Sequence, residues 1–123
     1  MKQLLYVFAG GGLGSVIRMM ISRSVNPLMV LPAGTLLSNA LAALLLGISL
    51  AFIARKSEWS IEWQYAVITG FCGGLSTFST FSGETMRLYS NEMPYIALLN
   101  MVLNICVSFF CVWIGQRMIE QYY

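Results

Sequence analysis

Residues 70–83 read Gly-Phe-Cys-Gly-Gly-Leu-Ser-Thr-Phe-Ser-Thr-Phe-Ser-Gly, and they lie in an apolar segment, residues 63–86, that is long enough to cross a bilayer. Paired glycines weaken a helix, and lipid offers no replacement hydrogen bonds to the backbone groups that are released. Those groups must therefore face protein, water or an ion. The stretch predicts a membrane helix broken near Gly74, beside a polar path through the membrane.

The composition predicts an all-α integral membrane protein. Of the 123 residues, 58% are hydrophobic and only 10% are charged. A hydrocarbon core of about 30 Å requires roughly 20 helical residues. Four apolar segments have a suitable length: 4–21, 33–53, 63–86 and 95–114. We expect a single domain, residues 1–123, of four transmembrane helices, with the third broken near the bilayer midplane.

The first segment follows Lys2, an arrangement that is also typical of a secretory signal peptide. The segment carries four glycines within residues 10–14, however, and no clear small-x-small cleavage site follows before Arg18. We therefore interpret it as the first transmembrane helix.

The chain offers no candidate base for enzyme chemistry and no transition-metal site. It has no histidine, and none of its five carboxylates has a metal-ligand spacing. Cys72, Cys106 and Cys111 lie inside apolar segments, where we expect them to be small packing residues. We expect a protein that is not an enzyme.

The positive charges are divided almost evenly between the two predicted faces of the membrane. The two sets are Lys2, Arg55, Lys56 and Arg117 on one face, and Arg18, Arg23 and Arg87 on the other. Lys and Arg in loops set the orientation of insertion. Because the bias is four against three, we expect insertion in both orientations and an antiparallel homodimer.

Two glycine pairs, Gly10 with Gly14 and Gly70 with Gly74, have the small-xxx-small spacing that lets helices approach closely in lipid. For the first pair, association between chains and contact within one chain are equally supported. For the second pair, the additional Gly73 favours a helix break over close packing. In an antiparallel dimer two such breaks would meet at the twofold axis, where their backbone carbonyls would suit a small hard cation such as Na⁺.

Polar side chains recur along the third and fourth segments. Phe78 and Phe81 share a helix face, interleaved with hydroxyls of Thr77, Ser79, Thr80 and Ser82. Asn100, Asn104 and Ser108 recur every four residues, and Asn39 adds an amide in the second segment, beside Thr35 and Ser38. Aromatic packing and interhelical hydrogen bonding are the ordinary explanations of such groups. Three polar residues in register favour a polar path for an ion through the membrane. The amides, hydroxyls and positive phenyl edges are hydrogen-bond donors, which favours a small anion as the ion that moves along this path.

Three motifs together place the sequence: residues 70–82, Gly-Thr-Leu-Leu-Ser-Asn at 34–39, and Gly-Gly-Leu-Gly-Ser-Val-Ile-Arg at 11–18. They resemble the Fluc (CrcB) fluoride channels over essentially the whole chain. The resemblance implies a fluoride-selective passive channel of bacterial inner membranes that exports fluoride from the cytoplasm. It also implies an antiparallel homodimer with two pores and a central structural Na⁺.

The resemblance also assigns residues. Phe78 and Phe81 would contact fluoride, with Asn39 opposite them and Thr80 supplying a hydroxyl. The polar track of the fourth helix would be Asn100, Asn104 and Ser108. Backbone carbonyls of Gly73 and Ser76 from both chains would hold Na⁺. Arg18 would lie at the aqueous vestibule, and Glu84 near the inner part of the third helix's second half.

Ser38, Ala42 and Val112 depart from the commoner pattern of that family, and Val112 suggests that the polar track ends at Ser108. The same donors could pass chloride, so fluoride follows only from the resemblance. A small multidrug exporter is a competing hypothesis, but neither Glu62 nor Glu84 is in the first helix, where proton coupling would need a deep carboxylate. A purely structural subunit would not require the polar stripe.

Overall fold

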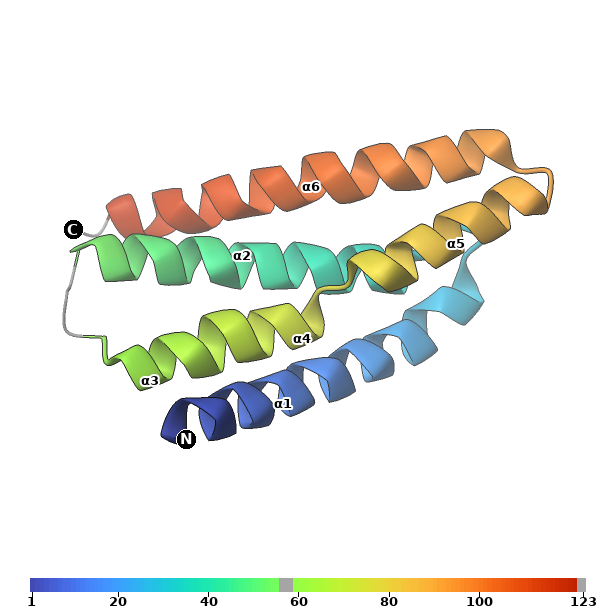
Figure 1. Cartoon of the computed structure of the whole chain (residues 1–123). Helices are drawn as coiled ribbons and strands as arrows, with labels where there is room; N and C mark the ends of the chain where they lie inside the picture. Colours follow the sequence, from blue (N-terminus) through green and yellow to red (C-terminus); the bar gives the residue numbers. More distant parts are fainter. Residues whose placement is uncertain (56–58, 122–123) are drawn as a thin grey trace.

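The structure is a computed structural model that describes residues 1–55 and 59–121, and every regular element in these two ranges is helical (Figure 1). In chain order the elements are α1 Lys2–Val25, η1 Asn26–Leu28, α2 Ala33–Arg55, α3 Ile61–Gln64, η2 Tyr65–Cys72, α4 Gly73–Leu75, α5 Phe78–Ser90 and α6 Pro94–Glu120. The prediction of an all-α fold is confirmed.

Three stretches are long and apolar enough to span a membrane: Lys2–Leu28, Ala33–Arg55 and Pro94–Glu120. They contain three of the four predicted segments and extend beyond them, because a helix continues through polar flanking residues while its backbone hydrogen bonds are made. The remaining predicted segment, 63–86, is divided among α3, η2, α4 and α5. No single helix of that segment is long enough to span by itself.

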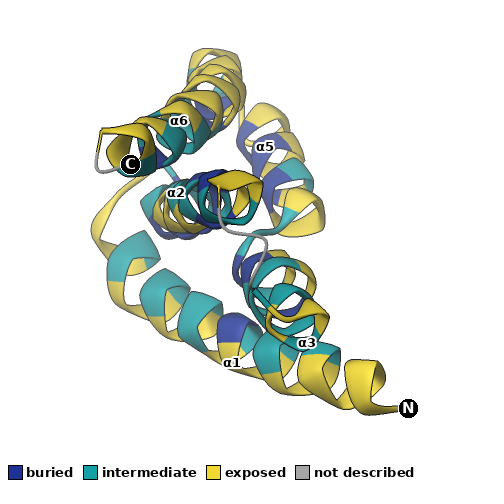
Figure 2. Ribbon diagram, turned by 90° about the vertical axis from the view of Figure 1, so that its left-hand side faces the viewer, coloured by how far each residue is buried: buried dark blue, intermediate teal, exposed yellow. Residues whose placement is uncertain are grey.

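Helix α2 is the central element of the bundle. It contacts α1 on one side and α5 and α6 on the other, as the end-on view shows (Figure 2). Its contact with α6 is close because Gly47 lies against the Val112 carbonyl and Gly115 lies against the Leu44 carbonyl. A side chain at either glycine would collide with backbone, so these positions let the two helices touch.

Helix α1 packs against η2 and α4 through both predicted glycine pairs. A Cβ atom on Gly10 would lie 2.9 Å from the Phe71 nitrogen, and one on Gly70 would lie 2.9 Å from the Val7 oxygen. Gly14 and Gly74 are equally close to the facing backbone. Packing within one chain therefore accounts for the first pair, and the preference for a helix break over close packing at the second pair is wrong.

The interruption of the helical path lies two residues after Gly74, at Ser76 and Thr77. Ser76 has φ −80° and ψ 156°, and Thr77 has φ −154° and ψ 121°, which are extended conformations. Before it, η2 is a π-helical stretch, a rare form that often marks functional sites. After it, the Thr77 hydroxyl accepts a hydrogen bond from the Thr80 N–H and caps α5. The position of this interruption in a bilayer stays a prediction.

The amino end of α1, the carboxyl end of α2 and the carboxyl end of α6 lie at the same end of the bundle (Figure 1). Lys2, Arg55 and Arg117 therefore share one end, and Arg23 and Arg87, in the last turns of α1 and α5, share the other. Lys56 lies outside the described residues. The insertion of both orientations stays a prediction.

Candidate functional site

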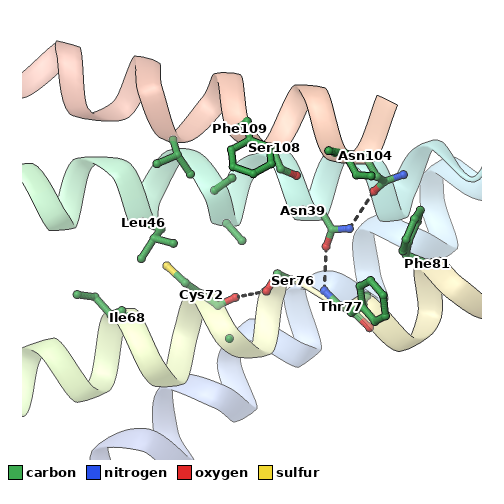
Figure 3. Close-up of a pocket in the computed structure, with 16 residues that line it drawn as sticks. Asn39, Leu46, Ile68, Cys72, Ser76, Thr77, Phe81, Asn104, Ser108 and Phe109 are labelled. Atoms are coloured by element: carbon green, nitrogen blue, oxygen red, sulfur yellow. Dashed lines mark hydrogen bonds between the residues drawn. The ribbon is translucent and has the colours of Figure 1, made fainter. Parts of the chain in front are cut away.

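An open groove of about 580 Å³ runs between α2, α6 and the interrupted segment (Figure 3). Its walls are mostly apolar, and its polar side chains gather near the interruption. The lining residues are Asn39, Ala42, Ala43, Leu46, Ile68, Cys72, Gly73, Ser76, Thr77, Phe78, Phe81, Asn104, Ile105, Ser108, Phe109 and Val112. Seven of the nine residues assigned to the pore or to Na⁺ lie along it, and Asn100 and Thr80 do not.

Asn39 joins three elements at the groove. Its Oδ1 accepts the Thr77 N–H at 2.8 Å, and its Nδ2 donates to Asn104 Oδ1 at 2.9 Å, as the dashed lines in Figure 3 show. The Asn39 side chain thus replaces the helical partner that Thr77 lacks, and this allows the interruption. Because the amide oxygen accepts one hydrogen bond and the amide nitrogen donates another, the Asn39 side chain has a single orientation.

The hydrogen bonds continue from Asn104 into α5. Asn104 Nδ2 donates to both Asn100 O and Asn100 Oδ1 at 3.0 Å. Asn100 Nδ2 donates to Thr85 Oγ1 at 2.8 Å, and Thr85 Oγ1 donates to the Phe81 carbonyl at 2.8 Å. We call Asn39, Asn104, Asn100 and Thr85 the amide chain. Asn100 is 0% exposed and serves this network behind the groove.

Phe78 and Phe81 form a tilted pair at the mouth of the groove. Their ring centroids are 5.7 Å apart, with 56° between the ring planes. Phe81 is 8% exposed, whereas Phe78 is 81% exposed. Phenyl edges carry positive potential, so the pair can offer ring hydrogens to an anion. The exposed Phe78 leaves this mouth uncovered within one chain.

Thr80 and Ser108 occupy different positions relative to the groove. Thr80 is exposed at the start of α5, where its hydroxyl accepts from Thr77 Oγ1 at 3.1 Å. Ser108 lies on the α6 wall, one helical turn beyond Asn104, as Figure 3 shows. Ala42 and Val112 also line the groove, whereas Ser38 is buried and donates to the Gly34 carbonyl at 2.9 Å. Of the three departures, two therefore touch the groove.

The interruption changes the bonding of the backbone carbonyls of Gly73 and Ser76. In a continuous α-helix the N–H groups of Thr77 and Thr80 would bond to them. Here the Thr77 N–H donates to Asn39 Oδ1, and the Thr80 N–H donates to Thr77 Oγ1. Both carbonyls thus lose their helical donors, and carbonyl oxygens are suitable ligands for an alkali cation. The two backbone carbonyls are therefore chemically suited to the expected role as Na⁺ ligands.

Arg18 lies beside the interruption in this structure. Its Nε donates to the Gly74 carbonyl at 3.0 Å, and the Ser15 hydroxyl donates to the same oxygen at 3.5 Å. Gly74 is another carbonyl whose helical donor, the N–H four residues later, is moved away by the extended backbone. Arg18 therefore stabilises the end of α4, where the helical path is interrupted. Its place at a vestibule stays a prediction.

Glu84 is buried on α5 and receives two hydrogen bonds that the sequence did not indicate. Thr35 Oγ1 donates to Glu84 Oε1 at 2.9 Å, and Asn26 Nδ2 donates to the same oxygen at 3.3 Å. Asn26 Oδ1 in turn accepts the Gly34 N–H at 2.7 Å. Thr85 was also missed, although it lies four residues after Phe81 and so shares its helix face.

Comparison with known proteins shows which family the chain belongs to. The family model described as CrcB-like protein, Camphor Resistance (CrcB), matches residues 5–116. The chain therefore belongs to the CrcB-like family. Its curated relatives carry the name of an ion channel, so the chain is a member of a channel family and not an enzyme.

Two relatives illustrate the similarity. The "Fluoride-specific ion channel FluC" of Serratia proteamaculans is 44% identical over 109 residues, which cover 88% of this chain and 86% of that protein. The protein of the same name from Salmonella arizonae is 44% identical over 110 residues, covering 89% and 87%. Both relatives come from bacteria, and the matches span nearly the whole bundle.

Proposed function

We propose that this protein is a fluoride-selective passive channel of the bacterial inner membrane, which lets fluoride leave the cytoplasm down its electrochemical gradient. The observation that carries the proposal is the groove, in which the Asn39 amide, the Phe78 and Phe81 ring edges and the Ser108 hydroxyl are gathered. Relatives that match most of this chain and are named fluoride-specific ion channels support the choice of ion.

The proposed chemistry is replacement of water around the anion. Fluoride is small and strongly hydrated, so it needs several close donors in a narrow route. Amide, hydroxyl and ring hydrogens are weak donors, and several weak sites in series allow an ion to enter and also to leave. A full positive charge deep in the route would hold the anion too tightly.

We further propose that the working unit is an antiparallel homodimer with two pores. Phe78 is 81% exposed beside an open groove, and a Cβ atom on Gly73 would meet nothing within 4 Å. Both features suit a surface that a second copy covers. The backbone carbonyls of Gly73 and Ser76 from the two chains would hold the central Na⁺, which would supply a positive charge that joins the interrupted segments.

The test is fluoride efflux from liposomes that contain variants of the groove. We expect Asn39→Asp to abolish fluoride efflux because it replaces the donating amide by a negative carboxylate, and Phe81→Ile to abolish it because it removes the ring edge. Dimer content, followed by size-exclusion chromatography, should stay unchanged in both. Wild-type efflux in both variants would contradict the assignment, and strict dependence on a proton gradient would favour an exporter.

A further inference from the structure

The bonds of the amide chain all run in one direction. Donation passes from the Thr77 N–H to Asn39, then to Asn104, Asn100 and Thr85, and ends at the Phe81 carbonyl. An asparagine side chain presents an acceptor on one side and a donor on the other. Turning any one amide by 180° would therefore place two donors or two acceptors face to face.

Groups that cannot reverse determine this direction. At one end the Thr77 N–H can only donate, and at the other end the Phe81 carbonyl can only accept. In the middle, the backbone carbonyl of Asn100 accepts from Asn104 Nδ2 at 3.0 Å. Each amide is thereby oriented from both sides. The Asn100 side chain, which is the second acceptor for Asn104 Nδ2, is itself oriented by a residue outside the groove.

Thr85 is that outside residue. Its hydroxyl proton is used on the Phe81 carbonyl, so a lone pair of Oγ1 faces Asn100 Nδ2. Asn100 is 0% exposed, so bulk solvent does not reach its amide. Without the hydroxyl, Asn100 would have a buried N–H group with no acceptor, and its amide would turn away from the position that serves Asn104.

We propose that Thr85 is a positioning residue for the groove. Acting through Asn100 and Asn104, it holds the Asn39 amide with one Nδ2 hydrogen on Asn104 and the second Nδ2 hydrogen directed to an anion in the groove. The proposal rests on the proposed function for the identity of that anion. Thr85 itself does not line the groove.

The experiment compares Thr85→Val, which lacks the hydroxyl, with Thr85→Ser, which keeps it. Ser82→Ala is the matched control, because the Ser82 hydroxyl also donates to a carbonyl four residues earlier on α5, that of Phe78, at 2.9 Å, but lies outside the amide chain. Each protein is labelled with ¹⁵N-asparagine and placed in lipid vesicles. The side-chain amide signals of Asn39, assigned by their loss in Asn39→Ala, and fluoride efflux are then measured.

We expect Thr85→Val to shift the Asn39 side-chain signal and to lower fluoride efflux about tenfold, while Thr85→Ser and Ser82→Ala stay close to wild type. In the wild type, added fluoride should shift one of the two Asn39 Nδ2 hydrogens and leave the other. This second measurement needs no variant, so the amide orientation that the proposal requires can be contradicted even if Thr85→Val fails to fold.

An unchanged Asn39 signal in folded Thr85→Val would overturn the proposal. So would equal shifts in Thr85→Val and Thr85→Ser, or two Asn39 hydrogens that respond identically to fluoride. If wild-type vesicles retain their fluoride, the proposed function fails, and the Asn39 signal in the Thr85 variants still decides whether Thr85 orients the amide.

Discussion

Asn39 is the residue at which the helix interruption and the groove meet. The same amide accepts the Thr77 N–H and donates to Asn104, so it replaces a lost helical bond and also presents a donor. A comparable arrangement surrounds Glu84, whose Oε1 accepts from Thr35 and Asn26. The Asn39 amide and Glu84 Oε1 are thus oriented by partners from other parts of the chain, which satisfies these polar atoms where lipid cannot.

Thr35→Val tests this dependence at the Glu84 carboxyl. The valine keeps the shape of threonine but removes the hydroxyl that donates to Glu84 Oε1 at 2.9 Å. We expect a loss of roughly 1–3 kcal/mol in the free energy of unfolding, the usual cost of an unpaired buried polar group. The measurement is thermal unfolding in detergent, with Thr35→Ser as the control. Equal melting temperatures for the two variants would contradict this bond's contribution.

At the scale of elements, the sequence predicted the helical segments but not the point of interruption. Hydropathy located residues 33–53 within α2 because apolar length alone determines a span. The interruption was expected near Gly74, whereas it lies at Ser76 and Thr77. It depends on Asn39, which is distant in sequence. Spacing within one segment cannot reveal that a side chain of another helix replaces the carbonyl acceptor of the Thr77 N–H.

The site was predictable to a similar extent. Side-chain types and i, i+4 spacing brought Asn104 and Ser108 to the groove wall. Asn100 has the same spacing, but α5 covers it, so its amide bonds to Thr85 instead. Which partner a buried amide finds depends on how two helices cross. A periodic pattern along one helix carries no information about that crossing.

Gly14→Ala tests the close contact between α1 and α4. An added Cβ at Gly14 would lie 2.8 Å from the Leu75 nitrogen, and it would meet backbone that cannot move aside. We expect destabilisation by about 1–3 kcal/mol, typical of overpacking. Gly12→Ala is the matched control on the same helix, because its Cβ would meet nothing within 4 Å. Equal unfolding temperatures for the two variants would contradict the contact.

For the whole molecule, the open groove and the nearly balanced charges at the two ends of the bundle point to one proposed assembly. Lys2, Arg55 and Arg117 lie at one end, and Arg23 and Arg87 at the other. A small difference in charge lets one sequence insert in either direction. Two inverted copies could then cover each other's exposed Phe78.

Added charge should separate the two orientations. We expect Asn91→Lys with Glu92→Lys, at one end, to insert in one direction, and Gln3→Lys with Gln121→Lys, at the other end, to insert in the opposite direction. Each form alone should lose fluoride efflux, and co-expression of the two should restore it. Full efflux from either form alone, with its uniform orientation verified by cysteine labelling, would contradict an antiparallel dimer.

Removal of Na⁺ tests the junction of the interrupted segments. Replacing Na⁺ by N-methylglucamine, a cation too large for a carbonyl cage, should lower efflux or dissociate the proposed dimer, because the Gly73 and Ser76 carbonyls would repel one another. The measurement is efflux together with the dimer fraction on size-exclusion chromatography. Indifference of both quantities to the cation would contradict a central Na⁺.

The most direct measurement is the release of fluoride and of chloride from liposomes that contain the purified wild-type protein, followed with ion-selective electrodes under a potassium gradient and valinomycin. The account predicts rapid fluoride release without ATP or a proton gradient, and vesicles that retain most of their chloride. Fluoride-tight vesicles, or equal release of the two halides, would contradict it.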